Sequence, residues 1–236
     1  MQISFVAAAA LAVLAASATA HADPVITDGS FESPAYGATG VYGGGGDGWT
    51  TSFHGAVSIV NGNIQDGNGD FYGATPFGDQ YLGLDPRSHG FVSADSQDIA
   101  GFVAGQTYAL TLYVADSDGG TAPQLEIVLS DGSGTDYVDR TIDVAVGGPY
   151  GRVIDFQQVT TTFTSTITGD MTLSLINSGN VFASPGADPG SISIDNVSLS
   201  TASAVPEPMQ ALSLILGLGF IGARSLRNRP ARRRAV

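Results

Sequence analysis

The stretch Thr107-Tyr-Ala-Leu-Thr-Leu-Tyr-Val-Ala115 decides the fold class, because every second side chain in it is a large apolar one. A period of two places alternate side chains on opposite faces of a strand, so the pattern predicts a strand with one buried face. The same alternation runs through residues 124–130 and 191–199. In the last stretch the apolar parity switches at Asp195-Asn196, which predicts a β-bulge or a kink there.

Further strands are expected wherever β-branched and aromatic residues lie between turn residues. These expected strands are 56–60, 80–84, 91–99, 137–144, 156–164 and 171–177. Glycine-rich pairs such as Asn61-Gly62 and Asp131-Gly132 separate them, and no part of residues 23–204 has a helical period. Many short antiparallel strands predict an all-β domain, an antiparallel β-sandwich of the jelly-roll type.

Charge divides the chain of 236 residues into segments of opposite character. Six of its nine arginines fall in the last 13 residues, and lysine is absent. Residues 23–204 keep three arginines against 21 acidic residues, a net charge of −18. Such a surface repels nucleic acid and suits divalent cations or simply solubility. The absence of cysteine excludes disulfides, thiolate zinc sites and cysteine nucleophiles.

The N-terminal 22 residues have the pattern of a secretory signal peptide. An apolar run, residues 3–16, is followed by small residues that end in Ala20-His21-Ala22. We expect signal peptidase to cut after Ala22 or, as second choice, after Ala20. Met1-Gln2 carries no basic residue, so either the terminal amine serves alone or the start lies upstream. The alternative interpretation is a buried helix of the domain itself.

Several motifs in the middle of the chain come in a recognisable order. They are Ile26-Thr-Asp-Gly-Ser-Phe-Glu32, Gly48-Trp-Thr50, Asp79-Gln-Tyr-Leu-Gly-Leu-Asp85, Val103-Ala-Gly-Gln-Thr-Tyr108 and Ile194-Asp-Asn-Val-Ser-Leu199. This order resembles the galactose-binding-like jelly rolls, which include carbohydrate-binding modules. The resemblance implies that the first and last strands lie side by side. It also implies a structural Ca²⁺ held there by Glu32, Asp195 and backbone carbonyls. Alternatively, both carboxylates are exposed at a sheet edge.

The C-terminal segment, residues 205–236, resembles a PEP-CTERM sorting signal. Pro206-Glu207-Pro208 precedes the apolar residues 209–223, and an arginine cluster follows. Fifteen helical residues span about 22 Å, less than a hydrocarbon core of about 30 Å. We therefore expect transient anchoring in the inner membrane, with the arginines cytoplasmic. The resemblance implies cleavage at the motif by an exosortase-type transpeptidase and release to the cell surface or matrix. The alternative is an ordinary anchor that is never cut.

The amino-acid sequence is compatible with three functions. The first is a non-enzymatic surface or matrix protein that engages exopolysaccharide, as in a biofilm. The second is a polysaccharide hydrolase that uses a carboxylate pair, and the third is a purely structural matrix protein. No catalytic residue is assigned, because the two histidines after residue 22, His54 and His89, are expected in exposed loops.

Two further residue classes were weighed for ligand binding. Carboxylates in the 66–70 loop, together with Asp116 and Asp118, are alternative ion ligands. Trp49 is expected in the core, and other aromatic residues lie in glycine-rich loops where a sugar ring could stack: Tyr36, Tyr42, Phe53, Phe71, Tyr72 and Phe77.

Overall fold

The chain was analysed as a computed structural model. It describes residues 23–35, 41–53, 56–62, 73–86, 92–116, 123–145, 155–177 and 190–202. The signal segment 1–22 and the sorting motif Pro206-Glu207-Pro208 with the apolar segment 209–223 lie outside these ranges, so both remain predictions. Within the described ranges, no helix has the length and apolar character needed to cross a membrane.

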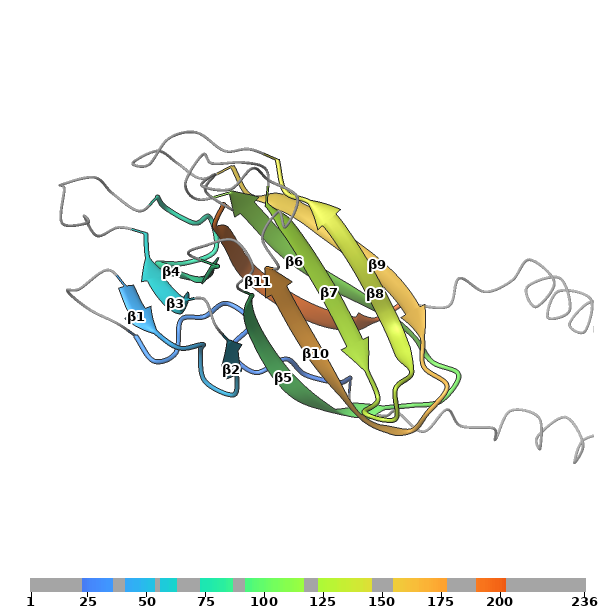
Figure 1. Ribbon diagram of the computed structural model, residues 1–236. Coiled ribbons are helices and arrows are strands. Elements are labelled where there is room, and N and C mark those ends of the chain that lie inside the picture. The colour runs from blue at the N-terminus through green and yellow to red at the C-terminus, as the bar shows by residue number, and fades with distance from the viewer. Residues whose placement is uncertain are drawn as a thin grey trace, which may run out of the picture. The chain divides into compact units, whose positions relative to one another are not determined.

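In the part of the chain that the structure describes, eleven antiparallel strands form two sheets that pack face to face (Figure 1). Sheet A has the order β1 (Val41–Gly43), β3 (Ala56–Asn61), β4 (Gln80–Asp85), β11 (Ile192–Thr201), β6 (Thr107–Asp116) and β9 (Gln157–Thr164). Sheet B has the order β2 (Thr50–Phe53), β5 (Ser93–Phe102), β10 (Gly169–Asn177), β7 (Gln124–Ser130) and β8 (Asp136–Asp143). The predicted all-β sandwich of antiparallel strands is confirmed.

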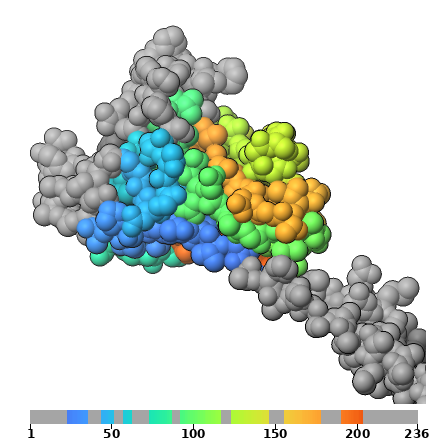
Figure 2. All heavy atoms as spheres, turned by 90° about the horizontal axis from the view of Figure 1, so that it is seen from below, coloured from blue at the N-terminus to red at the C-terminus, as the bar shows by residue number. Residues whose placement is uncertain are grey.

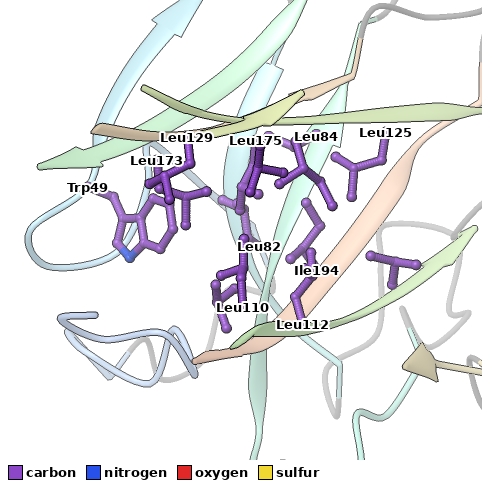
Figure 3. Close-up of a cluster of buried hydrophobic side chains, with 14 of the residues drawn as sticks. Trp49, Leu82, Leu84, Leu110, Leu112, Leu125, Leu129, Leu173, Leu175 and Ile194 are labelled. Carbon is purple, nitrogen blue, oxygen red and sulfur yellow. The ribbon is translucent and has the colours of Figure 1, made fainter. Parts of the chain in front are cut away.

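The alternation read from the sequence sets which side chains enter the space between the sheets. Leu110 and Leu112 of β6 face Leu173 and Leu175 of β10, while Ile194 of β11 lies between them (Figure 3). All five are fully buried. Burying one such side chain contributes about 1.5 to 3 kcal/mol, and this core must hold the sandwich without a disulfide.

One inner strand departs from this apolar pattern. The inward side chains of β5 begin with Ser93, Asp95 and Gln97, and all three are buried. These polar groups lie at the β2 side of sheet B, where the N-terminal segment and residues 44–49 cover the sandwich. The candidate site forms along this polar side of the domain.

Candidate functional site

The N-terminal segment, residues 23–35, contains no strand and is held to both sheets by hydrogen bonds. The Gln97 side chain of sheet B accepts a hydrogen bond from Thr27 N at 2.7 Å and donates to Thr27 O at 2.9 Å. On sheet A, Val197 N donates to Gly29 O at 2.8 Å. Figure 2 shows this segment, in blue, lying on the surface of the described domain.

Trp49 and Phe31 fill the space under this segment. The Trp49 indole Nε1 donates to the Thr27 carbonyl at 3.1 Å, and its ring lies 5.3 Å from the Phe31 ring between centroids. Phe31 is fully buried and Trp49 is 8% exposed. The prediction that Trp49 belongs to the core is confirmed, so this aromatic side chain is unavailable for stacking on a ligand.

The predicted irregularity at Asp195-Asn196 is also confirmed, and it positions Asp195. The register of β11 against β6 shifts between Asp195 and Ser198, and Asn196 has a φ of 49°. Asparagine tolerates this left-handed conformation better than most residues. The extra residue lets Ile194 and Val197 both enter the core, while Asp195 lies on the outer side of sheet A.

A single loop, residues 75–80, binds both carboxylates that the resemblance singled out. The Thr75 hydroxyl donates to Asp195 Oδ2. Glu32 Oε1 accepts hydrogen bonds from Asp79 N and Gln80 N, both at 2.8 Å. We call this segment the bridging loop.

The bridging loop approaches Glu32 at a glycine. A Cβ atom at Gly78 would lie 2.1 Å from Glu32 Oε1, and Gly78 has a φ of 150°. Glycine is therefore needed there both for space and for backbone conformation.

The strand arrangement differs from the one expected around Glu32 and Asp195. Glu32 lies in the N-terminal loop, and the first strand, β1, pairs with β3 at the edge of sheet A, away from β11. The expectation that the first and last strands lie side by side is therefore wrong. The loop reaches β11 instead through the bond between Gly29 and Val197. Asp195 is fully buried, so the alternative that both carboxylates are exposed is wrong as well.

Burial and like charges act together on Asp195. The pKa of this carboxyl is raised to about 7, chiefly by burial and in smaller part by the negative charges of Glu32 and Asp28. Hydrogen bonds from Thr75 and from Asn196 N, the latter at 2.6 Å, oppose this rise. Burial likewise raises the pKa of Asp28. The site therefore concentrates negative charge.

No cation from the described ranges neutralises this charge. Arg140 is the one arginine in those ranges, and its Nη1 donates to Thr160 O of β9 at 3.0 Å. The described residues also contain no cluster of three or more His, Cys, Asp or Glu side chains that could hold a metal. Any ion at Glu32 and Asp195 would need backbone or hydroxyl oxygens as further ligands.

Of the alternative ion ligands, Asp116 alone belongs to the described ranges. Asp116 is buried at the end of β6, whereas Asp66, Asp70 and Asp118 lie outside the described residues. His54 and His89 lie outside them too.

The bridging loop contributes Phe77 to an aromatic pair on the outer side of sheet A. The Phe77 ring packs on the Tyr113 ring with centroids 4.1 Å apart and a tilt of 49°. Phe77 N donates to the Thr75 hydroxyl at 3.2 Å, so the aromatic pair and Asp195 share one loop. Both rings are half-buried.

Sequence reasoning named Phe77 but missed Tyr113 and Thr75. The alternation in residues 107–115 would have placed Tyr113 opposite to the leucines, on the outer face. No local pattern marks Thr75, which acts through a contact with a residue 120 positions away. Among the other aromatic residues named from the sequence, Tyr36, Phe71 and Tyr72 and the side chains of Tyr42 and Phe53 lie outside the description.

Asp95 is a second buried carboxylate, on the inner side of β5. Thr51 Oγ1 is 3.4 Å from its Oδ1, and its Oδ2 has no hydrogen-bond partner among the described residues. Gly45 covers it so closely that a Cβ there would lie 2.0 Å from Oδ2. Burial raises the pKa of Asp95 to about 7, against the lowering effect of hydrogen bonds from Thr51 and Ser96.

Comparisons with known proteins find similarity in structure only. No family model matches the chain, and no curated protein matches it. The CBM22-1 xylan-binding domain from Paenibacillus barcinonensis Xyn10C matches with a TM-score of 0.45 and 16% identity, over 79% of this chain and 99% of that one. The K1 cleaved adhesin domain of Lys-gingipain from Porphyromonas gingivalis W83 matches with a TM-score of 0.43 and 13% identity, over 74% and 96%.

Larger proteins match as well. The MgGH51 α-L-arabinofuranosidase has a TM-score of 0.49 and 12% identity, over 80% of this chain. This chain spans 28% of that enzyme and 20% of the bacteriophage CBA120 tailspike protein 4. Structures of carbohydrate-binding modules are thus among the neighbours, but similarity at this level decides neither family nor ligand.

The buried carboxylate of Asp95 predicts a pH-dependent stability. Because its folded pKa is raised to about 7, its contribution is fully present below about pH 4 and is lost as the pH rises through 7. We expect the unfolding free energy of Asp95→Asn, relative to wild type, to rise by about 2 to 4 kcal/mol from pH 4 to pH 8. Urea unfolding with chelator present measures this difference. The exposed Asp98→Asn on the same strand is the control, and parallel pH profiles for Asp95→Asn and wild type would refute the burial argument.

Proposed function

We propose that this chain is an exported, non-enzymatic protein of the cell surface or extracellular matrix that binds polysaccharide. The observation that carries the proposal is the Phe77–Tyr113 pair on the outer face of sheet A. A half-exposed ring offers an apolar face to the C–H groups of a pyranose and stays fixed by its buried half. The pair has a fixed geometry because Phe77 belongs to the bridging loop, which is bonded to β11.

The carboxylates of the site support a non-enzymatic role over a hydrolase. A glycosidase needs two carboxyl groups that reach a substrate from opposite sides, about 5 to 9.5 Å apart. Asp195 is fully buried under Thr75, and Glu32 Oε1 already accepts two backbone hydrogen bonds. Asp195 is therefore not presented to a polymer in solution, and the half-buried Glu32 has one oxygen bound to the backbone.

A purely structural matrix protein is the second candidate, and sheet B favours it. The outward side chains of β5, β10 and β7 include no aromatic residue. They are small, aliphatic, amide or acidic side chains, with Asp98 and Glu126 among the acidic ones. Such a face suits solubility better than ligand recognition.

Export and sorting are proposed from the two chain ends. Residues 1–22 would direct secretion, and residues 209–223 would hold the protein at the inner membrane until an exosortase-type enzyme cuts near Pro206-Glu207-Pro208. Two prolines in a motif disfavour a helix, and an extended segment is the form in which a protease binds its substrate.

Processing at both ends is directly measurable. Mass spectrometry of the exported form should find a start at Asp23 or His21 and no peptide beyond about residue 208. A variant with Pro206 and Pro208 both replaced by alanine should instead keep the arginine-rich tail and stay with the membrane. Recovery of that tail on the wild-type surface protein would refute the sorting proposal.

We propose that Glu32 and Asp195 also hold a structural Ca²⁺. Ca²⁺ prefers carboxylate and carbonyl oxygens. The described ranges supply no cluster of three or more carboxylates for it, so backbone or hydroxyl oxygens would complete its ligands. They also supply no competing cation, since their one arginine, Arg140, donates to Thr160 O. Bound there, Ca²⁺ would neutralise the charge of Asp195 and its acidic neighbours. It would also join the N-terminal loop to β11, which no disulfide can do in this chain.

Removing Ca²⁺ should therefore lower the melting temperature of the wild type. A ligand at a hundredfold excess over its dissociation constant stabilises the fold by about 2.7 kcal/mol. For a domain of this size we expect chelator to lower the melting point by about 5 to 10 °C. Asp195→Asn should not respond to chelator, while the matched surface variant Asp98→Asn should respond like wild type. An equal response from Asp195→Asn would place the ion elsewhere.

Polysaccharide binding should depend on the aromatic pair. We expect Tyr113→Ala and Phe77→Ala to weaken binding by at least about tenfold, or about 1.4 kcal/mol, in calorimetry with a polysaccharide identified on a glycan array. Tyr137→Ala is the control, because Tyr137 is also half-buried but belongs to β8 of the other sheet. If the array shows no binding, the purely structural function replaces this proposal.

A further inference from the structure

The outer face of sheet A beyond Tyr113 carries hydroxyl groups and no charge. Its members are the outward side chains of three neighbouring strands, and we call this surface the hydroxyl face. They are Thr107, Ala109 and Thr111 of β6, Thr160, Thr162 and Thr164 of β9, and Ser198 and Ser200 of β11. The five side chains on β9 and β11 are exposed, and the three on β6 are half-buried.

The registers make this face a regular array. Thr111 lies between Ser198 and Thr160, and Ala109 lies between Ser200 and Thr162. Neighbouring strands are about 4.8 Å apart, and alternate residues repeat about every 6.8 Å along a strand. The face therefore extends about 20 Å along β6 from Thr107 to Tyr113, where it meets the aromatic pair.

Hydrogen bonds fix the hydroxyl groups while leaving capacity for a partner. The Oγ1 atoms of Thr107 and Thr164 are 2.9 Å apart, and those of Thr111 and Thr160 are 3.1 Å apart. Each hydroxyl has one proton and two lone pairs, so a pair that shares one proton keeps the other for an outside acceptor. The γ-methyl groups of the threonines lie among these hydroxyls. Such a surface can match both the hydroxyls and the C–H groups of a sugar.

The opposite face of the domain, the outer side of sheet B, carries negative charge, whereas the hydroxyl face carries none. The outer side of sheet B presents Asp98 on β5, Glu126 on β7, and Asp139 and Asp143 on the edge strand β8. Residues 23–204 carry a net charge of −18, so an uncharged face of this size stands out within the domain. An anionic polymer would be repelled by the surrounding carboxylates, and a cationic one would prefer the acidic face. The hydroxyl face is thus suited to an uncharged partner.

Pairing of another chain with the edge strand of sheet A, next to the hydroxyl face, is disfavoured. β9 is the last strand of sheet A, and an open edge could pair with a strand of another chain. Arg140 of β8 donates to the carbonyl of Thr160 at 3.0 Å and so occupies part of that edge. This contact disfavours addition of a strand to β9 and leaves the flat face as the surface for recognition.

From these observations we infer that a neutral polysaccharide binds along the hydroxyl face, with one sugar ring on Tyr113. This inference rests on the proposed function and adds the chemical class of the ligand and its course over the protein. The matching interaction is between uncharged hydroxyl groups on both sides, so binding depends little on ionic strength.

A charge placed in the middle of the face tests the inference. Thr162→Asp is suitable because Thr162 is exposed and lies opposite Ala109, so the change breaks neither threonine pair. Thr141→Asp is the matched control, since Thr141 is an exposed threonine on the edge strand β8 of sheet B. Melting temperatures close to wild type for both variants verify the fold.

The full chain is titrated with two soluble polymers of one backbone, neutral hydroxyethylcellulose and anionic carboxymethylcellulose, together with a glycan array. We expect the neutral polymer to bind more tightly than the anionic polymer at low salt. Thr162→Asp should weaken binding of the neutral polymer at least about tenfold, whereas Thr141→Asp should change it less than about twofold. Preference for the anionic polymer, or equal binding by Thr162→Asp and wild type, overturns the inference while polysaccharide binding itself stands. Absence of binding to every polymer and array glycan overturns the proposed function as well.

Discussion

The arrangement of the candidate site depends on the backbone hydrogen bond between Gly29 and Val197. This hydrogen bond lies at the β-bulge of β11, where the extra residue, Asn196, has a left-handed backbone conformation. A Cβ atom at Gly29 would lie 2.0 Å from the Val197 carbonyl oxygen, so this approach is open only to glycine. The contact brings the N-terminal loop against sheet A and with it Glu32, which in turn binds the bridging loop.

The bridging loop links elements that are far apart in sequence. Thr75 reaches Asp195 on β11, Gly78 leaves room for Glu32 from the N-terminal loop, and Phe77 between them packs on Tyr113 of β6. Neutralising the carboxylates would therefore affect more than the stability of the chain ends. Repulsion between Asp195 and Glu32 would also destabilise the bridging loop, which carries Phe77, because this loop is hydrogen-bonded to both carboxylates. The two carboxylates and the aromatic pair share this loop, so a change at the carboxylates is expected to alter the position of Phe77.

Much of the fold could be predicted from alternation, and little of the site could. The nine strands longer than five residues follow expected stretches, because a half-buried strand must repeat every two residues. The strands β1 and β2 were missed because Val41–Gly43 and Thr50–Phe53 are too short to show a period. The parity switch located the bulge at Asp195. Glu32 and Asp195 were paired by resemblance alone, since no local pattern shows that a loop residue lies near a strand 163 positions later. The contacts of Thr75 and the neutrality of the hydroxyl face depend on strand order, which alternation does not give.

The buried carboxylates of Asp95 and Asp195 both have a raised pKa, but the charges around them differ. Asp95 is alone: its elevated pKa comes from burial, and one proton is enough to remove the cost of its unpaired Oδ2. Asp195 lies near two other carboxylates, so protonating it would remove one charge and leave those of Glu32 and Asp28. The proposed Ca²⁺ would attract all three carboxylates at once and would need only oxygen ligands. The same sequence feature, an aspartate at a buried strand position, thus has two different electrostatic surroundings: burial alone at Asp95, and burial together with neighbouring negative charges at Asp195.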